Sequence, residues 1–120
     1  MVAKNEAAVA LRAFFRIADR WKLTPVECAA LLATSRSSIA RWTTNTEPAK
    51  LTRDQVERIS YILGIYVDLH AILGESPYAD AWVRQANTEF AGAAPLARML
   101  SGNVTDLADV RLYVAWRSDA

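Results

Sequence analysis

Helix-start signals recur along this chain and favour an all-helical fold. Thr24 is followed by Pro25 and then Glu27, an order that predicts a helix with Thr24 as its N-cap and Glu27 closing a capping box. Residues 52–55 and 76–77 repeat this kind of signal. All four glycines lie in the second half, and no run of β-branched residues alternates with period two. We therefore expect an all-α fold.

Apolar periodicity and caps divide the chain into a series of helices. The fourth should run from Thr52 to about Ile72 and carries apolar residues on more than one face. One side of this long central helix should pack on an N-terminal domain, residues 1–70. The other should meet a C-terminal domain, residues 71–120, or a second copy of the chain. The remaining helices are expected over residues 5–20, 24–32 and 35–42, and from Pro77, Pro95 and about Asn103.

Composition and charge leave two interpretations open. Hydrophobic residues make up 52% of the sequence, which fits either an apolar surface kept for partners or an alanine-rich helical protein. Residues 1–60 carry ten Lys/Arg and six Asp/Glu, whereas residues 61–120 carry four Arg and seven Asp/Glu. A basic first half suits a polyanion, but the difference is modest and charge alone does not establish DNA binding.

Several classes of function are disfavoured. The longest apolar run is shorter than the ~20 residues of a membrane span, and residues 1–6 lack a signal peptide's apolar core. A single cysteine, Cys28, fits a reducing cytoplasm. Neither Cys28 nor His70, the only histidine, has a plausible partner set in sequence. We therefore expect a cytoplasmic protein with no membrane partner, and no catalytic residue, metal or cofactor.

Residues 26–42 resemble the Xre-type helix-turn-helix of repressors. Ala29 is small where two helices cross, and Leu31, Leu32 and Ile39 are apolar where they must pack. Ala33 stands where the family usually has glycine. The resemblance implies a recognition helix in the major groove, and the predicted DNA contacts are Ser35, Arg36, Ser37, Ser38 and Arg41. The alternative is a helix pair that no longer binds DNA and serves in dimerisation or docking. Trp42 is expected in the core.

The second half carries another resemblance. Trp82, Asn87, Gly92, the pair Pro95-Leu96 and Gly102 fall in an order that resembles the toxin-binding domain of the Xre/ParS/MbcA antitoxins. The partners of that family are RES-domain toxins, which attack NAD or use it for ADP-ribosylation. Trp82 should anchor this small lobe, and Gly92 and Pro95 should shape its turns.

The resemblance also implies where a toxin would bind. In relatives the antitoxin's C-terminal end approaches or blocks the NAD pocket of the toxin. Here the last helix and a short polar tail, together residues 104–120, would take that place, with Arg111, Tyr113, Trp116 and Arg117 as the toxin-binding candidates. The alternative for Trp116 is that it closes the core of its own lobe.

Together these observations predict an Xre-like helix-turn-helix lobe, a long central helix and a small C-terminal toxin-binding lobe. The expected function is that of a type II antitoxin that neutralises a RES-domain toxin and represses its own operon by binding operator DNA. Self-association is expected as a dimer, or within a toxin–antitoxin hetero-oligomer. The alternative function is a free-standing transcriptional repressor whose C-terminal lobe only dimerises.

Overall fold

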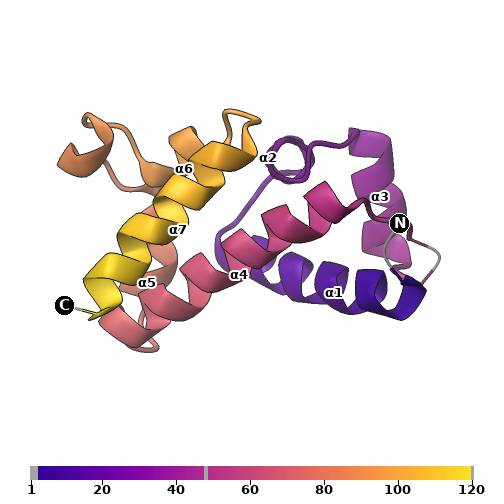
Figure 1. Cartoon of the computed structure of the whole chain (residues 1–120), viewed down its shortest axis with the longest axis horizontal. Coiled ribbons are helices and arrows are strands. Elements are labelled where there is room, and N and C mark those ends of the chain that lie inside the picture. Colours follow the sequence, from indigo (N-terminus) through magenta and orange to yellow (C-terminus); the bar gives the residue numbers. More distant parts are fainter. Residues whose placement is uncertain (1–2, 48, 120) are drawn as a thin grey trace. The chain divides into compact units, whose positions relative to one another are not determined.

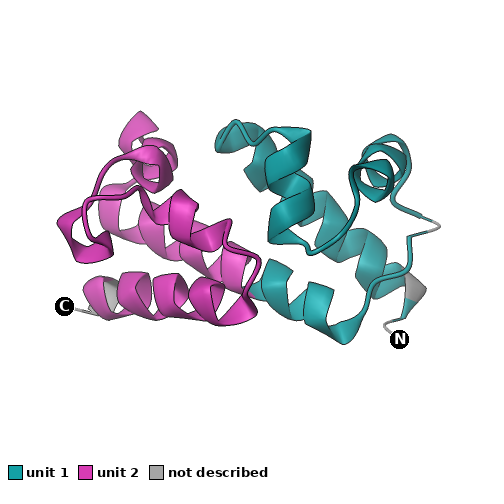
Figure 2. Ribbon diagram, turned by 90° about the horizontal axis from the view of Figure 1, so that it is seen from above, with its two compact units in different colours: residues 1–60 teal, residues 61–120 magenta. Residues whose placement is uncertain are grey.

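The computed structural model describes residues 3–47 and 49–119, which form helices joined by turns and loops, with no β-strand among them. The chain forms two compact units, residues 1–60 and 61–120, shown in different colours in Figure 2. The long helix α4 (Arg53–Leu73) crosses the boundary between them (Figure 1). The all-α fold is confirmed. The expected domain boundary after residue 70 stays a prediction, although the two units divide ten residues earlier.

The first unit consists of α1 (Lys4–Arg20), α2 (Pro25–Leu31), α3 (Arg36–Thr44) and the beginning of α4. Helix α1 has an apolar stripe at three- and four-residue spacing, and this stripe turns inward because burying it removes apolar surface from water. The large side chains that are fully buried in this unit are Leu11, Phe14, Trp21, Leu31, Leu32, Leu51 and Ile59.

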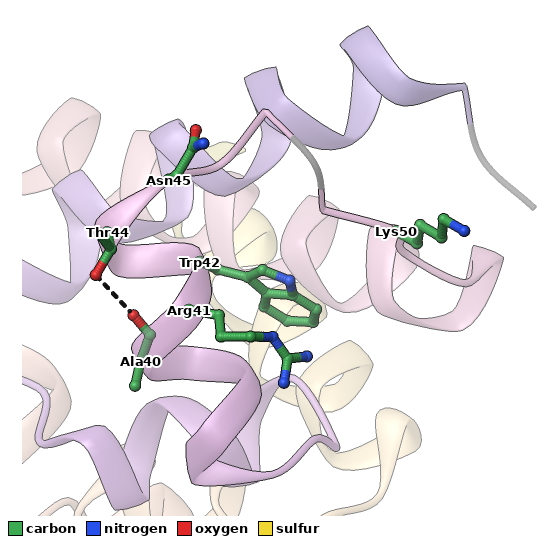
Figure 3. A pocket seen from close by; sticks show the side chains of 6 residues that line it. All are labelled: Ala40, Arg41, Trp42, Thr44, Asn45 and Lys50. Atoms are coloured by element: carbon green, nitrogen blue, oxygen red, sulfur yellow. Dashed lines mark hydrogen bonds between the residues drawn. The ribbon is translucent and has the colours of Figure 1, made fainter.

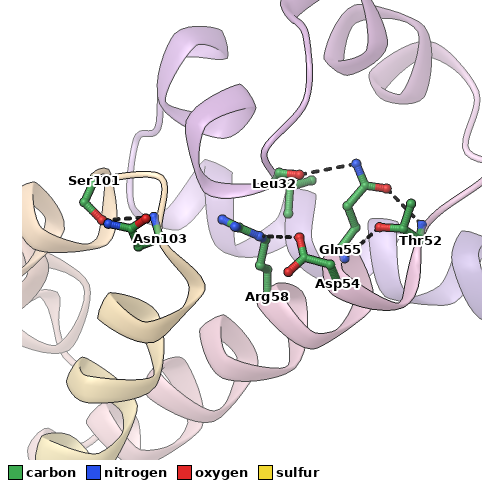
Figure 4. A network of polar contacts seen from close by, with 7 residues as sticks. All are labelled: Leu32, Thr52, Asp54, Gln55, Arg58, Ser101 and Asn103. Carbon is green, nitrogen blue, oxygen red and sulfur yellow. Dashed lines mark hydrogen bonds and ion pairs between the residues drawn. The ribbon is translucent and has the colours of Figure 1, made fainter.

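Both capping boxes predicted for the first unit are present. The Thr24 hydroxyl accepts a hydrogen bond from the Glu27 backbone N–H at 3.1 Å, and the Glu27 carboxylate accepts one from the Thr24 N–H at 2.9 Å. Thr52 and Gln55 make the equivalent pair at 3.0 and 3.1 Å before α4. The Gln55 side chain also donates to the Leu32 carbonyl at 3.3 Å, so the cap of α4 is tied to the end of α2 (Figure 4).

The second unit follows α4 with short elements and ends on a long helix. These are α5 (Pro77–Ala81), the single 3₁₀ turns η1 (Trp82–Arg84) and η2 (Thr88–Phe90), α6 (Pro95–Met99) and α7 (Val104–Asp119). Helix α6 packs on both η1 and α7. The buried large side chains include Ile62, Ile65, Leu69, Val83, Met99, Leu107, Val110 and Val114.

An ion pair joins α4 and α7 within the second unit. The Arg111 guanidinium lies 2.6 Å from the Asp68 carboxylate. The Arg111 side chain passes across the backbone of Gly64, where an added Cβ would lie only 2.0 Å from Arg111 Nε. A glycine in a helix interior is normally unfavourable by about 1 kcal/mol relative to alanine. Here the missing side chain makes room for the arginine.

Polar contacts also order the loops of the second unit. His70 lies 3.0 Å from the Asp80 carboxylate and 3.1 Å from Glu75, and so connects the end of α4 to the beginning of α5. The Asp106 carboxylate, in the first turn of α7, accepts a hydrogen bond from the Ser101 hydroxyl at 2.6 Å. This bond, together with Arg98, lowers the pKa of Asp106. The Ser101 hydroxyl in turn accepts from the Asn103 backbone N–H at 3.1 Å (Figure 4).

Across residues 3–47 and 49–119, the helices are too short or too polar to cross a lipid bilayer.

Candidate DNA-binding and partner-binding surfaces

The turn between α2 and α3 sets the angle at which α3 is presented. Leu32 caps α2, and Ala33 then adopts a left-handed backbone with φ of 51°. The Thr34 N–H donates to the Ala29 carbonyl at 2.9 Å and closes the turn. Left-handed geometry is strained for any residue with a Cβ, which is why related turns use glycine. Ala33 therefore adopts a strained conformation at the position where the family usually has glycine.

The first turn of α3 presents polar side chains to solvent. Arg36 and Ser37 are exposed, and no described residue offers Arg36 a hydrogen bond or ion pair. Ser35 precedes the helix as its N-cap, and its hydroxyl accepts a hydrogen bond from the Ser38 N–H at 3.1 Å. The Ser38 hydroxyl accepts from Arg41 at 3.2 Å. Arg36 and Ser37 are thus the side chains most available to a ligand.

This geometry corrects one detail expected from the sequence. Ser35 was placed at the start of the recognition helix, but α3 begins at Arg36. The Ser35 hydroxyl is used twice within the protein, since it also lies 3.1 Å from the Ser38 hydroxyl, to which it donates. The cause is the strong preference of serine for the N-cap position, where its oxygen satisfies a free backbone N–H. Whether any of the five predicted residues contacts DNA stays a prediction.

A groove of about 710 Å³ lies at the other end of α3 (Figure 3). Its lining comes from α3 and the loop that follows, and consists of Ala40, Arg41, Trp42, Thr44, Asn45 and Lys50. Trp42 is only 6% exposed, as expected for a core residue. Arg41 and Lys50 are both exposed and give the groove two cationic groups. Lys50 is not among the residues predicted to contact DNA, although lysine is a common phosphate-contacting residue.

Trp82 belongs to an aromatic cluster in the second unit. Its ring is nearly parallel to that of Tyr113, with an interplanar angle of 13° and centroids 6.3 Å apart. Phe90 meets both rings edge to face, with centroids 6.2 Å from Trp82 and 5.4 Å from Tyr113. Such edge-to-face and offset pairs are favourable arrangements for aromatic rings. The cluster fits the expected anchoring role of Trp82 and fixes Tyr113 on α7.

The turn after this cluster depends on glycine, as expected. Ala91 and Gly92 both have left-handed backbones, with φ of 56° and 84°. The Gly92 N–H donates to the Asn87 carbonyl at 3.0 Å, while the Asn87 side chain accepts from the Glu89 N–H at 2.9 Å. Pro95 then begins α6 at its first turn. These residues determine the shape of the turn that leads into α6.

The outward face of α7 carries two large apolar side chains one turn apart. Leu112 is 70% exposed and Trp116 is 65% exposed. The alternative that Trp116 closes the core of its lobe is therefore wrong. Valine and leucine residues on the opposite side of α7 already fill that core. Leu112 is not among the residues predicted to bind a toxin, although its spacing of four residues from Trp116 places both on one face of a helix.

The expected polar tail is also corrected. Helix α7 continues to Asp119, so residues 117–119 extend the helix and do not form a separate segment. Ala120, and the side chains of Ser118 and Asp119, lie outside what the structure describes. Arg117 is exposed, whereas Arg111 is engaged with Asp68. The four residues predicted to bind a toxin therefore differ in how accessible their side chains are to a partner.

Metal-ligand groups and the single cysteine can be assessed in the described residues. No group of three or more His, Cys, Asp and Glu side chains among them is arranged to hold a metal ion. Cys28 is buried, and burial together with the nearby Glu27 and Asp19 carboxylates raises the pKa of its thiol to about 11. A thiol in this state is a poor nucleophile at neutral pH because the thiolate is the reactive form.

The helix pair α2–α3, with its tight turn and exposed first turn of α3, defines a helix-turn-helix protein. Residues 1–64 match the antitoxin Xre-like helix-turn-helix domain family, and the chain belongs to that family. The chain is also similar to the uncharacterized protein y4oB of Sinorhizobium fredii (strain NBRC 101917 / NGR234). The two are 41% identical over 105 residues, which cover 87% of this chain and 80% of that protein.

Proposed function

We propose that this Xre-type antitoxin neutralises a RES-domain toxin by binding it through the second unit. The observation that carries the proposal is the exposure of Leu112 and Trp116 on one face of α7. Tryptophan is enriched among the residues that dominate binding energy at protein interfaces. Two adjacent large apolar side chains left in water are unfavourable in a free monomer, and a partner that covers them removes that cost. Tyr113 and Arg117 flank this face and would add contacts.

Two observations support a toxin partner, and the second of them suggests its class. The family match concerns residues 1–64 and identifies an antitoxin helix-turn-helix. The order of Trp82, Gly92, Pro95 and Gly102 resembles the toxin-binding domain whose partners are RES-domain toxins. Such a toxin degrades NAD or ADP-ribosylates a protein. We expect both antitoxin and toxin to act in the cytoplasm, where their targets are found.

A co-expression experiment tests this function. The RES-domain toxin encoded beside this gene should arrest growth when produced alone. Co-production of this chain should restore growth, and the two proteins should co-purify. Trp116→Ala should weaken the complex while leaving the fold intact, because the side chain is mostly in solvent. Failure of the unaltered chain both to restore growth and to co-purify would refute the proposal.

We further propose that the first unit binds operator DNA and represses the operon. The exposed first turn of α3 supports this role, with Arg36 and Ser37 turned to solvent for base edges. Arg41 and Lys50, on the groove after α3, would contact phosphates. Two half-sites require two-fold symmetry, so we expect a dimer on DNA.

Arg36→Ala tests the DNA-binding proposal. One lost base contact should weaken operator binding by about 1–3 kcal/mol, as measured by gel-shift titration. Arg16→Ala is the matched control, because it removes the same charge from the exposed surface of α1. Toxin binding should be unchanged in both variants. Equal affinity for operator in the Arg36 variant and the unaltered chain would place the DNA surface elsewhere.

The second candidate function is a free-standing repressor whose second unit only dimerises. The same exposed α7 face would then be covered by a second copy of the chain. That outcome predicts operator binding with full affinity and no complex with the neighbouring toxin.

A further inference from the structure

A small cavity of about 90 Å³ opens in the second unit, beside the exposed face of α7. It lies between the last turns of α4 and α7, with η1 forming one wall. Ile72 and Leu73, at its edge, are 42% and 39% exposed and therefore accessible from solvent. The side chains that line the cavity include Leu69, Ile72, Leu73, Trp82, Tyr113 and Arg117.

The volume decides what kind of ligand fits. Sites for drug-sized molecules and cofactors are typically about 300–1,000 Å³, several times larger than this cavity. A water molecule needs only about 10–15 Å³ measured in this way. A volume of about 90 Å³ therefore fits several waters or one aliphatic side chain. Because more of the wall is apolar than polar, and its side chains are mostly aliphatic or aromatic, an aliphatic side chain is the better occupant.

The aromatic wall of the cavity is formed before any partner arrives. Trp82 and Tyr113 lie nearly parallel, and Phe90 holds both by edge-to-face contacts. Aromatic rings fixed in this way lose little further freedom on binding. A preformed apolar recess beside exposed apolar side chains has the character of a pocket for an interface anchor residue.

Arg117 places a positive charge at the cavity. Its side chain is exposed, and no described residue pairs with it. By contrast, Arg98 is paired with Asp106 and Asp109, and Arg111 is paired with Asp68. A cation that is free beside an apolar recess favours a partner carboxylate, and an arginine binds a carboxylate in a defined two-point geometry.

We propose that this cavity receives one aliphatic side chain of the toxin, with an Asp or Glu of the same toxin segment pairing with Arg117. The inference rests on the proposed function and adds the chemistry of the segment that docks. The recess supplies apolar contacts, and the arginine sets the orientation. The docking segment thus carries an aliphatic residue with an acidic neighbour.

A second copy of the chain fits this requirement less well. Six carboxylates in residues 61–120 have described side chains, and five of them lie within ion-pair distance of Arg or His in the same unit. Only Glu89 has no such partner. The second unit of another copy therefore has little free negative charge to offer Arg117, whereas a separate protein is not restricted in this way.

Two tryptophan substitutions on α4 test the cavity. Leu73→Trp replaces the leucine side chain at the cavity edge by a bulkier indole ring. This substitution should weaken binding of the co-encoded toxin at least about tenfold in calorimetric titration. Val67→Trp is the matched control, because Val67 is 60% exposed on the same helix and does not line the cavity. It should bind toxin like the unaltered chain. Thermal melting of each variant verifies that the fold is retained.

Arg117 provides a second measurement that does not depend on filling the cavity. Arg117→Gln should weaken toxin binding about three- to tenfold and reduce its salt dependence, whereas Arg117→Lys should retain more of it. Overlapping peptides that cover the toxin sequence should bind the unaltered chain where an aliphatic residue adjoins Asp or Glu. The Leu73→Trp variant should not bind those peptides.

The outcomes separate this inference from the proposed function. If the unaltered chain does not bind the toxin, both fail. If it binds, and Leu73→Trp and Arg117→Gln bind equally well, the cavity inference is overturned and the proposed function stands. If Leu73→Trp changes a dimer into a monomer in light scattering and leaves toxin affinity unchanged, a second copy occupies the cavity and the inference is likewise overturned.

Discussion

Replacing Gly64 by alanine should destabilise this protein, although alanine is the better helix former. Gly64 lies in the interior of α4, where alanine is favoured by about 1 kcal/mol. An alanine Cβ at this position would lie 2.0 Å from Arg111 Nε and 2.6 Å from Arg111 Cδ. Because the clash is with side-chain atoms of Arg111, the arginine side chain must move while the backbone of α4 stays helical. Its ion pair with Asp68 is then lost or distorted.

The magnitude follows from the environment of that ion pair. The side chains of Arg111 and Asp68 are 33% and 20% exposed, so the pair is only partly screened by water. A hydrogen bond between charged groups contributes about 1.5–3 kcal/mol. Subtracting the helix-propensity gain of about 1 kcal/mol leaves a net loss of about 0.5–2 kcal/mol for Gly64→Ala. The loss should disappear when the arginine is absent.

A double-mutant cycle in urea unfolding measures this dependence. In an Arg111→Ala background the three atoms nearest to the new Cβ are gone, so Gly64→Ala should stabilise by about 0.5–1 kcal/mol. The coupling free energy between the two positions should be about 1–3 kcal/mol. If Gly64→Ala shifts the free energy of unfolding by the same amount in both backgrounds, the side chain of Arg111 does not occupy this space.

The remaining predictions concern stability in the first unit and the face of α7. Thr24→Ala should lower the free energy of unfolding by about 1 kcal/mol, because it removes a helix cap. Ala33→Gly should raise it by about 0.5–1 kcal/mol by relieving a left-handed alanine, whereas Ala40→Gly, inside α3, should lower it by about 1 kcal/mol. Burial raises the pKa of Cys28 from 9.0 to about 11, so stability that is complete below about pH 9 falls toward pH 11. Chemical denaturation at several pH values measures this effect. Between about pH 9 and pH 11 the free energy of unfolding should fall by about 1–2 kcal/mol less in Cys28→Ala than in the unaltered chain. Trp116→Ala should leave the melting temperature within about 2 °C, and a larger drop would mean that the side chain packs in the core.

Much of the fold follows from local chemistry that the sequence displays directly. The capping box of Thr24 and Glu27 specifies where α2 begins, because the side chains satisfy backbone groups only three residues away. Pro77 and Pro95 likewise mark helix starts, since proline lacks the N–H that the first turn would leave unpaired. The left-handed conformation of Ala33 is consistent with the glycine that the resembled family usually has at this turn. Each of these signals acts over a few residues.

The candidate surfaces were harder to predict because they depend on packing between distant residues. Arg111 was expected to face a toxin, but Asp68, 43 positions earlier in the chain, pairs with it. The tail after Trp116 was expected to be free because it is short and polar, yet the helical pattern of α7 continues through it. Lys50 and Arg41 line one groove although nine positions separate them in the sequence. Pairings over such separations leave no periodic trace in one sequence.

The two faces of α7 differ in burial, so this one helix both stabilises its lobe and presents large apolar side chains to solvent. On one face, Leu107, Val110 and Val114 are at most 1% exposed, so their burial contributes to stability in the isolated chain. On the opposite face, Leu112 and Trp116 are mostly in solvent and contribute little until a partner covers them. Tyr113 lies between, held against Trp82, and Arg117 lies beside it at the cavity. Because the residues proposed to contact the toxin are not part of the core, substitutions among them should leave the lobe folded. Substitutions on the outer face should therefore alter which toxin is bound well before they alter stability.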